Sequence, residues 1–378
     1  MKLIAVTGTR ADFGLWLPVL REIGRRGRAD ARVELLVTGM HLDPRFGSTV
    51  REVRAAGFPI AAEVAASPEG DGRADMAAGL GTTLASLAPV LEDAAPDWLL
   101  LLGDRGEQLA AGLAALHLGI AVAHLHGGER TLGAVDDAFR DMITRLAHIH
   151  LVADASSAER LRRLGEAPWR ITVTGAPGLD DLAHVDAAAV SAVGERFGVA
   201  DEPYAVVIVH PETVGRADPR GLLDAVLDAV AEAGLPAVAI LPNADAGGRG
   251  IRETLLARAS ELRGVEASLP RDEYVALVAG ASVLIGNSSS GIIEAPLLGV
   301  PAVNVGDRQR GRLRGDNVID VAPDRVAIRD AIATATSPAF RERLSRTSPY
   351  GTGRAAPRIV DAILEQPIDD RLLVKEVA

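Results

Sequence analysis

Short runs of consecutive apolar residues recur along this chain, and longer segments with helical spacing separate them. In the first half these runs cover residues 3–7, 33–38, 98–102, 120–125, 149–152 and 171–174. Runs that are apolar throughout, rather than alternating, are typical of strands buried on both faces of a parallel sheet. Residues 15–25 and 108–118 have helical spacing, and Gly119 suits a helix C-cap. This rhythm predicts an α/β fold with a parallel sheet.

The same rhythm restarts in the second half, which indicates a second domain. Apolar runs cover residues 204–209, 237–241, 282–285 and 301–305, and helices are expected at 220–233 and 272–279. The chain has 378 residues, more than one ordinary core accommodates. The helix-like stretch 182–197 and a polar Asp-Glu-Pro step separate the halves. We expect two Rossmann-like α/β domains facing a cleft, residues 1–185 and 186–350.

Composition excludes several classes of function. The net charge of −11 gives no global attraction to nucleic acid or to an anionic membrane. Cysteine is absent, which excludes disulfides and thiolate metal sites. The first apolar run ends at Val6, too early for a signal peptide, and no apolar run reaches membrane-spanning length. We expect a cytoplasmic protein that binds neither nucleic acid nor membrane.

Each half contains a turn of small residues after an expected strand, VTGTRADFG in the first and GNSSSGIIE in the second. Ligands of parallel sheets bind outside the carboxyl ends of the strands. Gly286 permits an unusual backbone turn, and three serines then offer hydroxyl and backbone N–H groups. A helix expected at 292–298 would direct its positive end at the serines, which favours a phosphate site with Glu294 near ribose hydroxyls. The alternative is a serine N-cap with a glutamate that complements the helix dipole.

Two charged residues follow strands of the first half. The planar guanidinium of Arg10 suits a phosphate, although Arg10 could instead pair with Asp12 on the surface. Asp104 ends a run of four leucines, where partial desolvation raises the pKa of a carboxylate and suits it for proton transfer. The alternative for Asp104 is a cap on the following helix.

The stretch HLHGGERTLGAVDDAFRD places imidazoles and acids together after another strand. Its polar members are His124, His126, Glu129, Asp136, Asp137 and Arg140. His-x-His directs two rings to opposite faces of a strand, and no third ligand stands at a familiar spacing. The cluster therefore suits proton transfer better than metal binding.

In the second half, polar residues again follow strands. His210 and Asn243 end two of them, and a lone histidine at such a place is either structural or a ligand contact. Three arginines follow a third strand, and together with Arg10 they would neutralise a diphosphate within an acidic protein: Arg308, Arg310 and Arg312.

Taken together, these stretches resemble the hydrolysing UDP-N-acetylglucosamine 2-epimerases, especially the branch of sialic-acid biosynthesis. The similarity runs in the family's order from residue 6 to about residue 315. It covers VTGTRADFG, TGMHL, LLGDR, HLHGGE, VTGAPGLD, HPET, PNAD and GNSSSGIIEAP with GDRQRGR. The resemblance implies a glycosyltransferase-B-type fold in which residues 351–378 cross back to the first domain. It also implies no metal, no nicotinamide or other cofactor, a homodimer or homotetramer, and N-acetylmannosamine and UDP as products.

The resemblance also assigns roles. The catalytic residues are expected to be Asp104, Glu129, Asp136, His210 and His126. The residues expected to bind the UDP-linked sugar are Arg10, Ala11, His41, Arg105, Asp137, Arg140, Asn243, Ser288, Ser289, Ser290, Glu294 and Arg308.

One departure from the family pattern concerns position 126, where many relatives have glutamate and this chain has His126. Glu129 is then the nearest remaining carboxylate, and the H-x-H-G-G-E pattern is frequent in relatives that act on diacetamido sugars. Alternative functions are therefore the same reaction on UDP-N,N'-diacetylbacillosamine, a glycosyltransferase of the same fold, and a protein that binds nucleotide sugars without turnover. A nicotinamide-dependent epimerase is disfavoured because no G-x-G-x-x-G turn follows the first strand.

Overall fold

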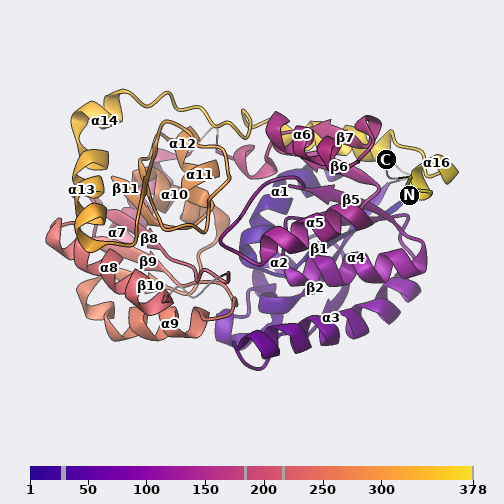
Figure 1. Cartoon of the computed structure of the whole chain (residues 1–378), viewed down its shortest axis with the longest axis horizontal. Helices are drawn as coiled ribbons and strands as arrows, with labels where there is room; N and C mark the ends of the chain where they lie inside the picture. The colour runs from indigo at the N-terminus through magenta and orange to yellow at the C-terminus, as the bar shows by residue number, and fades with distance from the viewer. Residues whose placement is uncertain (27–30, 183–184, 215–217, 377–378) are drawn as a thin grey trace. The chain divides into compact units, whose positions relative to one another are not determined.

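The computed structural model describes residues 1–26, 31–182, 185–214 and 218–376, which fall into two compact units. Unit 1 comprises Met1–Glu129, Asp136–Asp180 and Tyr350–Ala378, and unit 2 comprises Arg130–Val135 and Asp181–Pro349. Each unit is a parallel sheet between two layers of helices (Figure 1). The predicted α/β class is therefore confirmed.

The sheet of unit 1 has seven parallel strands in the order β3-β2-β1-β4-β5-β6-β7. Their bounds are Lys2–Thr7 (β1), Arg32–Thr38 (β2), Ile60–Val64 (β3), Trp98–Leu102 (β4), Ala121–Leu125 (β5), Ile149–Val152 (β6) and Ile171–Val173 (β7). The order reverses direction between β1 and β4, as in doubly wound nucleotide-binding sheets. That reversal marks the place at the carboxyl edge where such sheets bind ligands.

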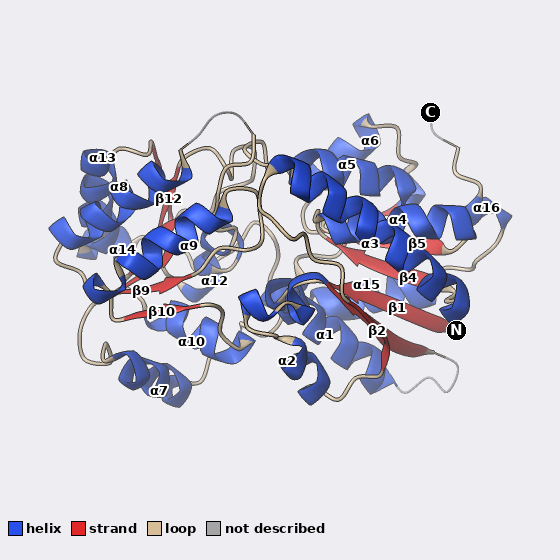
Figure 2. Ribbon diagram, turned by 90° about the horizontal axis from the view of Figure 1, so that it is seen from below, coloured by secondary structure: helices blue, strands red, loops and turns tan. Residues whose placement is uncertain are grey.

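Helices cover both faces of this sheet (Figure 2). They are Arg10–Arg26 (α1), Val50–Ala55 (α2), Arg73–Ala94 (α3), Gly106–Leu118 (α4), Asp136–Leu146 (α5), Ala155–Arg163 (α6), Ala355–Leu364 (α15) and Asp370–Leu373 (α16). Alternate residues of β1 enter two cores, Leu3 on the side of α1 and α15, and Ile4 on the side of α3 and α4. Burial on both faces explains why the strand is apolar throughout. The expected C-cap of α4 is confirmed, because Gly119 has a φ of 67°.

Unit 2 repeats the same strand order with six strands, β10-β9-β8-β11-β12-β13. The strands are Ala205–Ile208 (β8), Ala237–Ile240 (β9), Gly264–Glu266 (β10), Val283–Gly286 (β11), Ala302–Val305 (β12) and Val318–Val321 (β13). The helices are Ala187–Phe197 (α7), Pro219–Glu232 (α8), Gly248–Ala257 (α9), Arg271–Gly280 (α10), Ser290–Ile293 (α11), Ala295–Leu298 (α12), Arg325–Thr336 (α13) and Pro338–Glu342 (α14). Its sheet reverses between β8 and β11, so each unit has one such ligand-binding edge.

Three strands were not predicted from the sequence, and all three lie at sheet edges: β3, β10 and β13. Edge strands are only partly covered, and most residues of these three are half-buried or exposed. They therefore lack the continuous apolar run that identifies a central strand.

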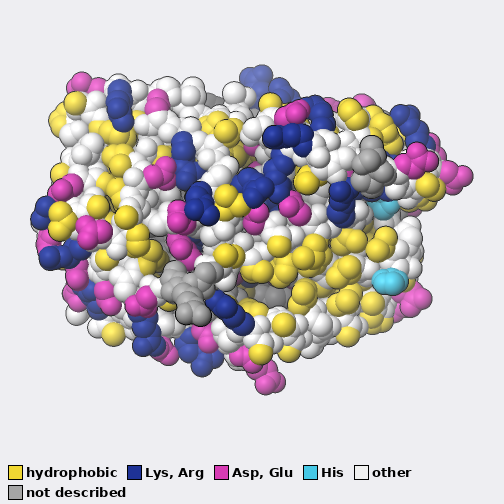
Figure 3. Space-filling model, viewed as in Figure 1, with side chains coloured by type: hydrophobic (Ala, Val, Ile, Leu, Met, Phe, Trp, Pro, Cys, Tyr) yellow, Lys and Arg dark blue, Asp and Glu magenta, His cyan; other side chains and the backbone are white. Residues whose placement is uncertain are grey.

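Among the described residues, α3 alone is long and apolar enough to cross a membrane by length and composition. The sequence expectation concerned uninterrupted apolar runs, and α3 is not one, because Thr82, Thr83 and Ser86 interrupt it. In the fold, α3 lies on unit 1, and its buried residues recur every four positions: Gly79, Thr83, Leu87 and Leu91. Figure 3 shows hydrophobic side chains gathered on the face of unit 1 that it presents to the viewer.

The excursion of residues 130–135 into unit 2 was not predicted from the sequence. Backbone hydrogen bonds hold this segment within unit 2, from Leu132 N–H to the Arg310 carbonyl at 3.2 Å and from Val214 N–H to the Gly133 carbonyl at 3.3 Å. A Cβ at Gly133 would lie 2.6 Å from the Arg308 Cα, so only glycine permits this approach. Contacts so distant in sequence leave no local signal.

Candidate functional site

The carboxyl ends of β8 and β11 form the candidate ligand-binding edge of unit 2. Gly286 ends β11 with a φ of 134°, and a Cβ there would lie 2.0 Å from the Ile208 carbonyl oxygen. The expectation that Gly286 permits an unusual turn is confirmed. His210 follows β8 at the same edge and is buried.

The side chain of Asn287 connects the ends of β8 and β11 by hydrogen bonds to His210. Asn287 was not among the residues predicted from the sequence. Its side-chain oxygen accepts from His210 N–H at 2.7 Å, and its amide donates to the His210 carbonyl at 2.9 Å. Its own carbonyl accepts from Gln309 at 2.8 Å and from Arg308 at 3.2 Å. A fully buried asparagine with this many partners organises the turn. In the sequence, Asn287 could have been noticed as an asparagine side chain between Gly286 and the three serines.

We expect Asn287→Ala to lower the free energy of unfolding by about 3 kcal/mol, because buried backbone groups of His210 lose both partners. Thermal and urea unfolding would measure this. Asn243→Ala is the matched control, since Asn243 is only half-buried and its backbone N–H lies 3.5 Å from the His210 ring. Equal stability of the two variants would contradict the role assigned to Asn287.

The three serines differ in their surroundings. Ser288 and Ser289 are half-buried, whereas Ser290 is buried. The Ser290 hydroxyl accepts from Tyr274 at 2.6 Å and donates to Glu294. Ser289 precedes α11 without a side-chain cap bond, but the Ser288 hydroxyl accepts from Ser290 N–H at 3.3 Å, so the serine N-cap alternative holds for Ser288.

Glu294 is engaged within unit 2 rather than open. Its second oxygen lies 2.5 Å from Arg271, a residue that sequence analysis did not name. The helix predicted at 292–298 is wrong as a single element, since α11 and α12 have four residues each and meet at Glu294. Pro296 lacks the N–H that would bond the Ile292 carbonyl, which explains the break.

The three arginines after β12 make different contacts. Arg308 is half-buried and its backbone N–H donates to Glu212 at 3.1 Å, so the glutamate of the HPET stretch anchors this loop. Arg312 donates to the Arg130 carbonyl at 3.2 Å. Arg310 is 62% exposed and lies 3.8 Å from Asp307, and the expectation that all three arginines serve one anion stays a prediction.

The ligand-binding edge of unit 1 includes the turn after β1, where Asp12 is buried. Its carboxylate accepts from Thr7 at 2.5 Å, Gly8 N–H at 3.0 Å and Thr9 N–H at 3.1 Å. His41 is fully buried and contacts Thr7 and Thr49 through its two ring nitrogens, at 3.0 and 2.7 Å. Burial lowers the pKa of His41 to about 4, so it is neutral near pH 7. His41 thus supports the turn through Thr7 and Thr49, and its assignment as a substrate contact stays a prediction.

Arg10 begins α1 beside this turn. It pairs with Glu52 of α2, with Arg10 Nε 2.5 Å from the carboxylate, so the alternative of an Arg10–Asp12 pair is wrong. Ala11 is exposed in the first turn of α1. A ligand phosphate would have to compete with Glu52 for Arg10.

Asp12 provides a pH prediction. Burial raises the pKa of its carboxyl to about 6, against the hydrogen bonds that lower it. The native state therefore binds more protons than the unfolded state between about pH 4 and pH 6, and its stability falls as pH rises through that window. The shift corresponds to about 3 kcal/mol. Between pH 4 and 7, we expect the free energy of unfolding of the wild type to fall by that amount relative to Asp12→Asn, as measured by urea unfolding. The same pH dependence in both proteins would contradict this.

Asp104 and Arg140 form an ion pair at the carboxyl end of β4. Arg140 of α5 is 1% exposed and also donates to the His126 carbonyl at 2.7 Å. His124, the last but one residue of β5, lies beside them and donates through Nε2 to the Gly103 carbonyl at 2.7 Å. Burial lowers the pKa of His124 to about 3, so its ring is neutral. Asp104 does not cap α4, whose N-cap is Arg105 without a side-chain bond.

Arg105 instead lies 2.8 Å from Glu107, which neighbours it at the start of α4. Asp136 and Asp137 occupy the first turn of α5 and are half-buried. The structure thus gathers Asp104, Arg140 and both aspartates at one edge of unit 1.

His126 and Glu129 form a second pair there, with Nδ1 2.5 Å from the carboxylate. His126 has a φ of 62°, a strained conformation for a residue with a side chain and typical of functional sites. Glu129 is therefore directly coupled to His126. Within the described residues, no three histidine, aspartate or glutamate side chains are arranged to hold a metal ion.

Comparison with known proteins decides the family. The family profile for UDP-N-acetylglucosamine 2-epimerase matches residues 24–364. The chain belongs to this family. It is 38% identical to the UDP-N,N'-diacetylbacillosamine 2-epimerase (hydrolyzing) of Legionella pneumophila, over 99% of this chain and 98% of that protein. It is 33% identical to the UDP-N-acetylglucosamine 2-epimerase of Neisseria meningitidis, over 89% and 88%.

Solved structures of family members have the same fold. The crystal structure of UDP-GlcNAc 2-epimerase from Neisseria meningitidis bound to UDP-GlcNAc superposes with a TM-score of 0.81 and 20% identity, covering 97% of this chain and 100% of that chain. The Methanocaldococcus jannaschii UDP-GlcNAc 2-epimerase in complex with UDP-GlcNAc and UDP gives a TM-score of 0.80 at 18% identity, over 97% and 100%. The predicted glycosyltransferase-B-type fold, with two Rossmann-like α/β units, is thereby confirmed, as is the resemblance found in the sequence.

Proposed function

We propose that this protein is a hydrolysing 2-epimerase that converts a UDP-linked 2-acetamido sugar into UDP and the free 2-epimeric sugar. The family match over residues 24–364 carries this proposal. The first substrate to consider is UDP-N-acetylglucosamine, which would give N-acetylmannosamine.

The chemistry explains why such a site needs both cationic and acidic groups. The hydrogen on sugar C2 is not beside a carbonyl and is barely acidic. When the C1–O bond to UDP breaks, C1 gains positive character and the C2 hydrogen becomes acidic. A base removes that proton to give a glycal and UDP. Water then adds to C1, and a proton returns to C2 on the opposite face. Two faces require two proton-transfer groups.

The residues divide between these tasks. We assign the departing diphosphate to Ser288, Ser289 and Arg308 of unit 2, whose hydroxyl and guanidinium groups stabilise developing negative charge. Proton transfer is assigned to unit 1, with Asp104 on one face and Glu129, coupled to His126, on the other. Asp136 is the alternative second group.

A second substrate, UDP-N,N'-diacetylbacillosamine, is favoured by a separate observation. The relative that is 38% identical carries that sugar in its name. His126 and the Gly-Gly-Glu that follows give this chain the H-x-H-G-G-E pattern frequent in relatives that act on such sugars.

Proton NMR of the products tests the function and ranks these substrates. The purified protein is incubated, without any acceptor, with UDP-N-acetylglucosamine, UDP-N,N'-diacetylbacillosamine, UDP-N-acetylgalactosamine or UDP-glucose. We expect UDP and a 2-epimeric sugar from one of the first two, and the ratio of kcat/KM identifies the preferred one. UDP release only with an added acceptor indicates a glycosyltransferase. UDP binding without any product indicates a protein without turnover.

A further inference from the structure

Lysine is almost absent from this chain. Of the 40 lysine and arginine residues, only Lys2 and Lys375 are lysines. Both ammonium groups lie at the carboxyl ends of helices of unit 1. Lys2 donates to the carbonyl of Ala94, the last residue of α3, at 2.7 Å. Lys375 donates to carbonyls of Thr144 and Ala147 at the end of α5, each at 2.8 Å. A compact ammonium has three donors that it can direct at several carbonyls of a helix end.

Lys375 also neutralises a carboxylate in the interior of unit 1. Its Nζ lies 2.8 Å from Oε2 of Glu166, whose side chain is completely buried. The same oxygen accepts from His150 Nε2 at 3.0 Å. Burial alone would raise the pKa of Glu166, but the hydrogen bonds from His150 and Lys375 lower it overall. The carboxylate is therefore ionised near pH 7, and Lys375 is its nearer countercharge, since Arg145, whose side chain is 46% exposed, lies 3.4 Å from Oε1.

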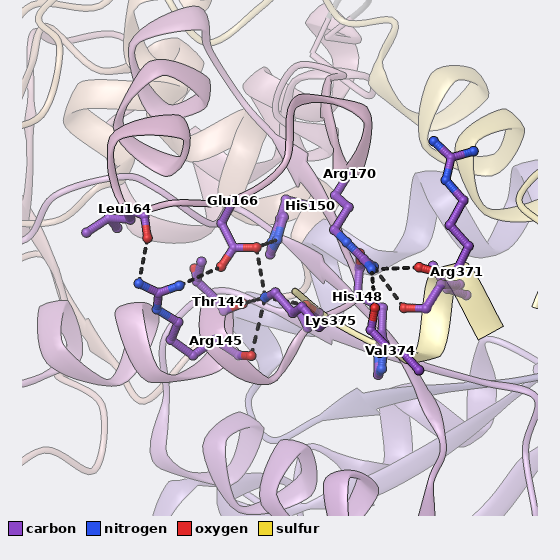
Figure 4. A network of polar contacts seen from close by, with 12 residues as sticks. Thr144, Arg145, His148, His150, Leu164, Glu166, Arg170, Arg371, Val374 and Lys375 are labelled. Atoms are coloured by element: carbon purple, nitrogen blue, oxygen red, sulfur yellow. Dashed lines mark hydrogen bonds and ion pairs between the residues drawn. The ribbon is translucent and has the colours of Figure 1, made fainter. Parts of the chain in front are cut away.

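The segment that carries Lys375 is itself fixed to unit 1 (Figure 4). Arg170 donates to the carbonyls of Leu372 at 2.9 Å and Arg371 at 2.8 Å. The guanidinium groups of Arg170 and Arg371 both lie over the Trp169 ring, 4.2 and 4.4 Å from its centre. These hydrogen bonds fix the backbone just before Lys375, and they thereby fix the position of its ammonium group.

The helix that Lys375 holds is the one that carries candidate catalytic groups. Asp136 and Asp137 stand at the first turn of α5, and Arg140, one turn later, pairs with Asp104. An α-helix of 11 residues is about 16 Å long and moves nearly as a rigid rod. A shift at the end held by Lys375 therefore displaces the aspartates at the other end.

The network also reaches the neighbouring strand. His150 of β6 is the register partner of His124 of β5, and β5 leads directly into His126. Through Glu166 and His150, Lys375 is connected to β6. This strand lies beside β5, which leads into the pair of His126 and Glu129.

We propose that Lys375 is a positioning residue for the candidate proton-transfer groups, because it holds the carboxyl end of α5 and the buried Glu166 together. The inference rests on the proposed 2-epimerase function. Misplacement of catalytic groups by about 1 Å lowers turnover by about 100-fold. We expect loss of the ammonium to lower kcat by about that factor and to change UDP affinity little, since the groups assigned to the diphosphate belong to unit 2.

The absence of cysteine from the chain permits a specific test. In Lys375→Cys the new thiol is alkylated in the unfolded protein, with bromoethylamine to restore an ammonium or with iodoacetamide to add a neutral amide, and the protein is refolded. Wild type taken through the same steps is the refolding control. We expect kcat to fall about 100-fold in Lys375→Cys, to recover to within about threefold with the ammonium, and to stay low with the amide. Equal kcat for the two alkylated forms would overturn the proposal.

Two further measurements separate positioning from folding and from the reaction itself. Lys2→Cys, treated identically, loses the corresponding contact on α3 and should keep wild-type kcat. Glu166→Gln/Lys375→Met removes both charges, leaves no unpaired buried ion, and should show the same loss of kcat in a folded protein; wild-type kcat there would refute the inference. Hydrogen exchange of residues 143–147 should be faster in Lys375→Cys than in wild type. Hydrogen exchange needs no substrate, so it tests whether Lys375 stabilises the end of α5 even when no UDP sugar is turned over. The substrate panel separately tests the proposed reaction.

Discussion

Asp104→Asn should lower kcat about 1000-fold and leave UDP affinity within about threefold of wild type. Loss of a positioned general base typically lowers the rate by 100- to 10,000-fold, roughly the range that a single proton-transfer group contributes. Asp104 stands at the carboxyl end of β4, paired with the buried Arg140. The amide keeps the size of the side chain and one acceptor for Arg140, but it cannot remove a proton. Product NMR and calorimetry with UDP provide the two measurements.

Asp141→Asn is the matched control for this prediction. Asp141 lies on the same helix as Arg140 and forms its own ion pair, 2.7 Å from Arg160, away from the strand end. We expect near wild-type turnover for this variant. The unfolding of both variants should be measured, because Asp104→Asn also weakens the countercharge of a buried guanidinium. A folded Asp104→Asn enzyme with wild-type kcat would remove Asp104 from the mechanism.

Turnover in D2O should place one deuterium at C2 of essentially every released sugar. The proton lost from C2 passes to a side chain that exchanges with solvent, and another group returns a proton on the opposite face. In 18O-water the label should enter the C1 hydroxyl, because the C1–O bond breaks and UDP keeps its original oxygen. A glycosyltransferase that used water as acceptor would give the same oxygen result with protium at C2.

Protium at C2 after turnover in D2O would refute elimination, unless a single base returned the same proton without exchange. The pair of His126 and Glu129, 2.5 Å apart, is the group able to act in that way. Repeating the experiment with His126→Glu and with Glu129→Gln distinguishes the two cases, because only a shuttle through this pair would change deuterium incorporation in those variants.

The central architecture could be predicted from the sequence because burial on both faces forces a strand to be apolar throughout. The bounds expected for 98–102 and 149–152 agree with β4 and β6. Three of the four edge strands, β3, β10 and β13, carry no such pattern and were missed, whereas the edge strand β7 was expected from its short apolar run at 171–174. Local backbone chemistry was equally readable, as Gly119 and Gly286 show, since only glycine adopts their conformations without strain.

Partners distant in sequence could not be predicted in the same way. Arg10 pairs with Glu52, 42 residues away, although a nearer aspartate was available. Asn287 bonds both backbone groups of His210 across 77 residues, and Lys375 meets the end of α5 across 228 or more. The contact of Asn287 with His210 arises from the strand order, which brings the carboxyl ends of β8 and β11 together, and that of Lys375 from the return of the C-terminal segment to unit 1. The candidate residues were therefore found singly, while their pairings required the structure.

The excursion of residues 130–135 has a practical consequence for dissecting the protein. The chain passes from one unit to the other after Glu129, Val135, Asp180 and Pro349, so no single cut yields either unit whole. A fragment of residues 181–349 would lack the segment that packs Gly133 against Arg308 and bonds the Arg310 carbonyl. A fragment that contains unit 1 alone would need a new linker between Glu129 and Asp136 in place of residues 130–135. In fragment complementation, or in domain exchange with relatives, the six residues 130–135 must therefore come from the same protein as unit 2.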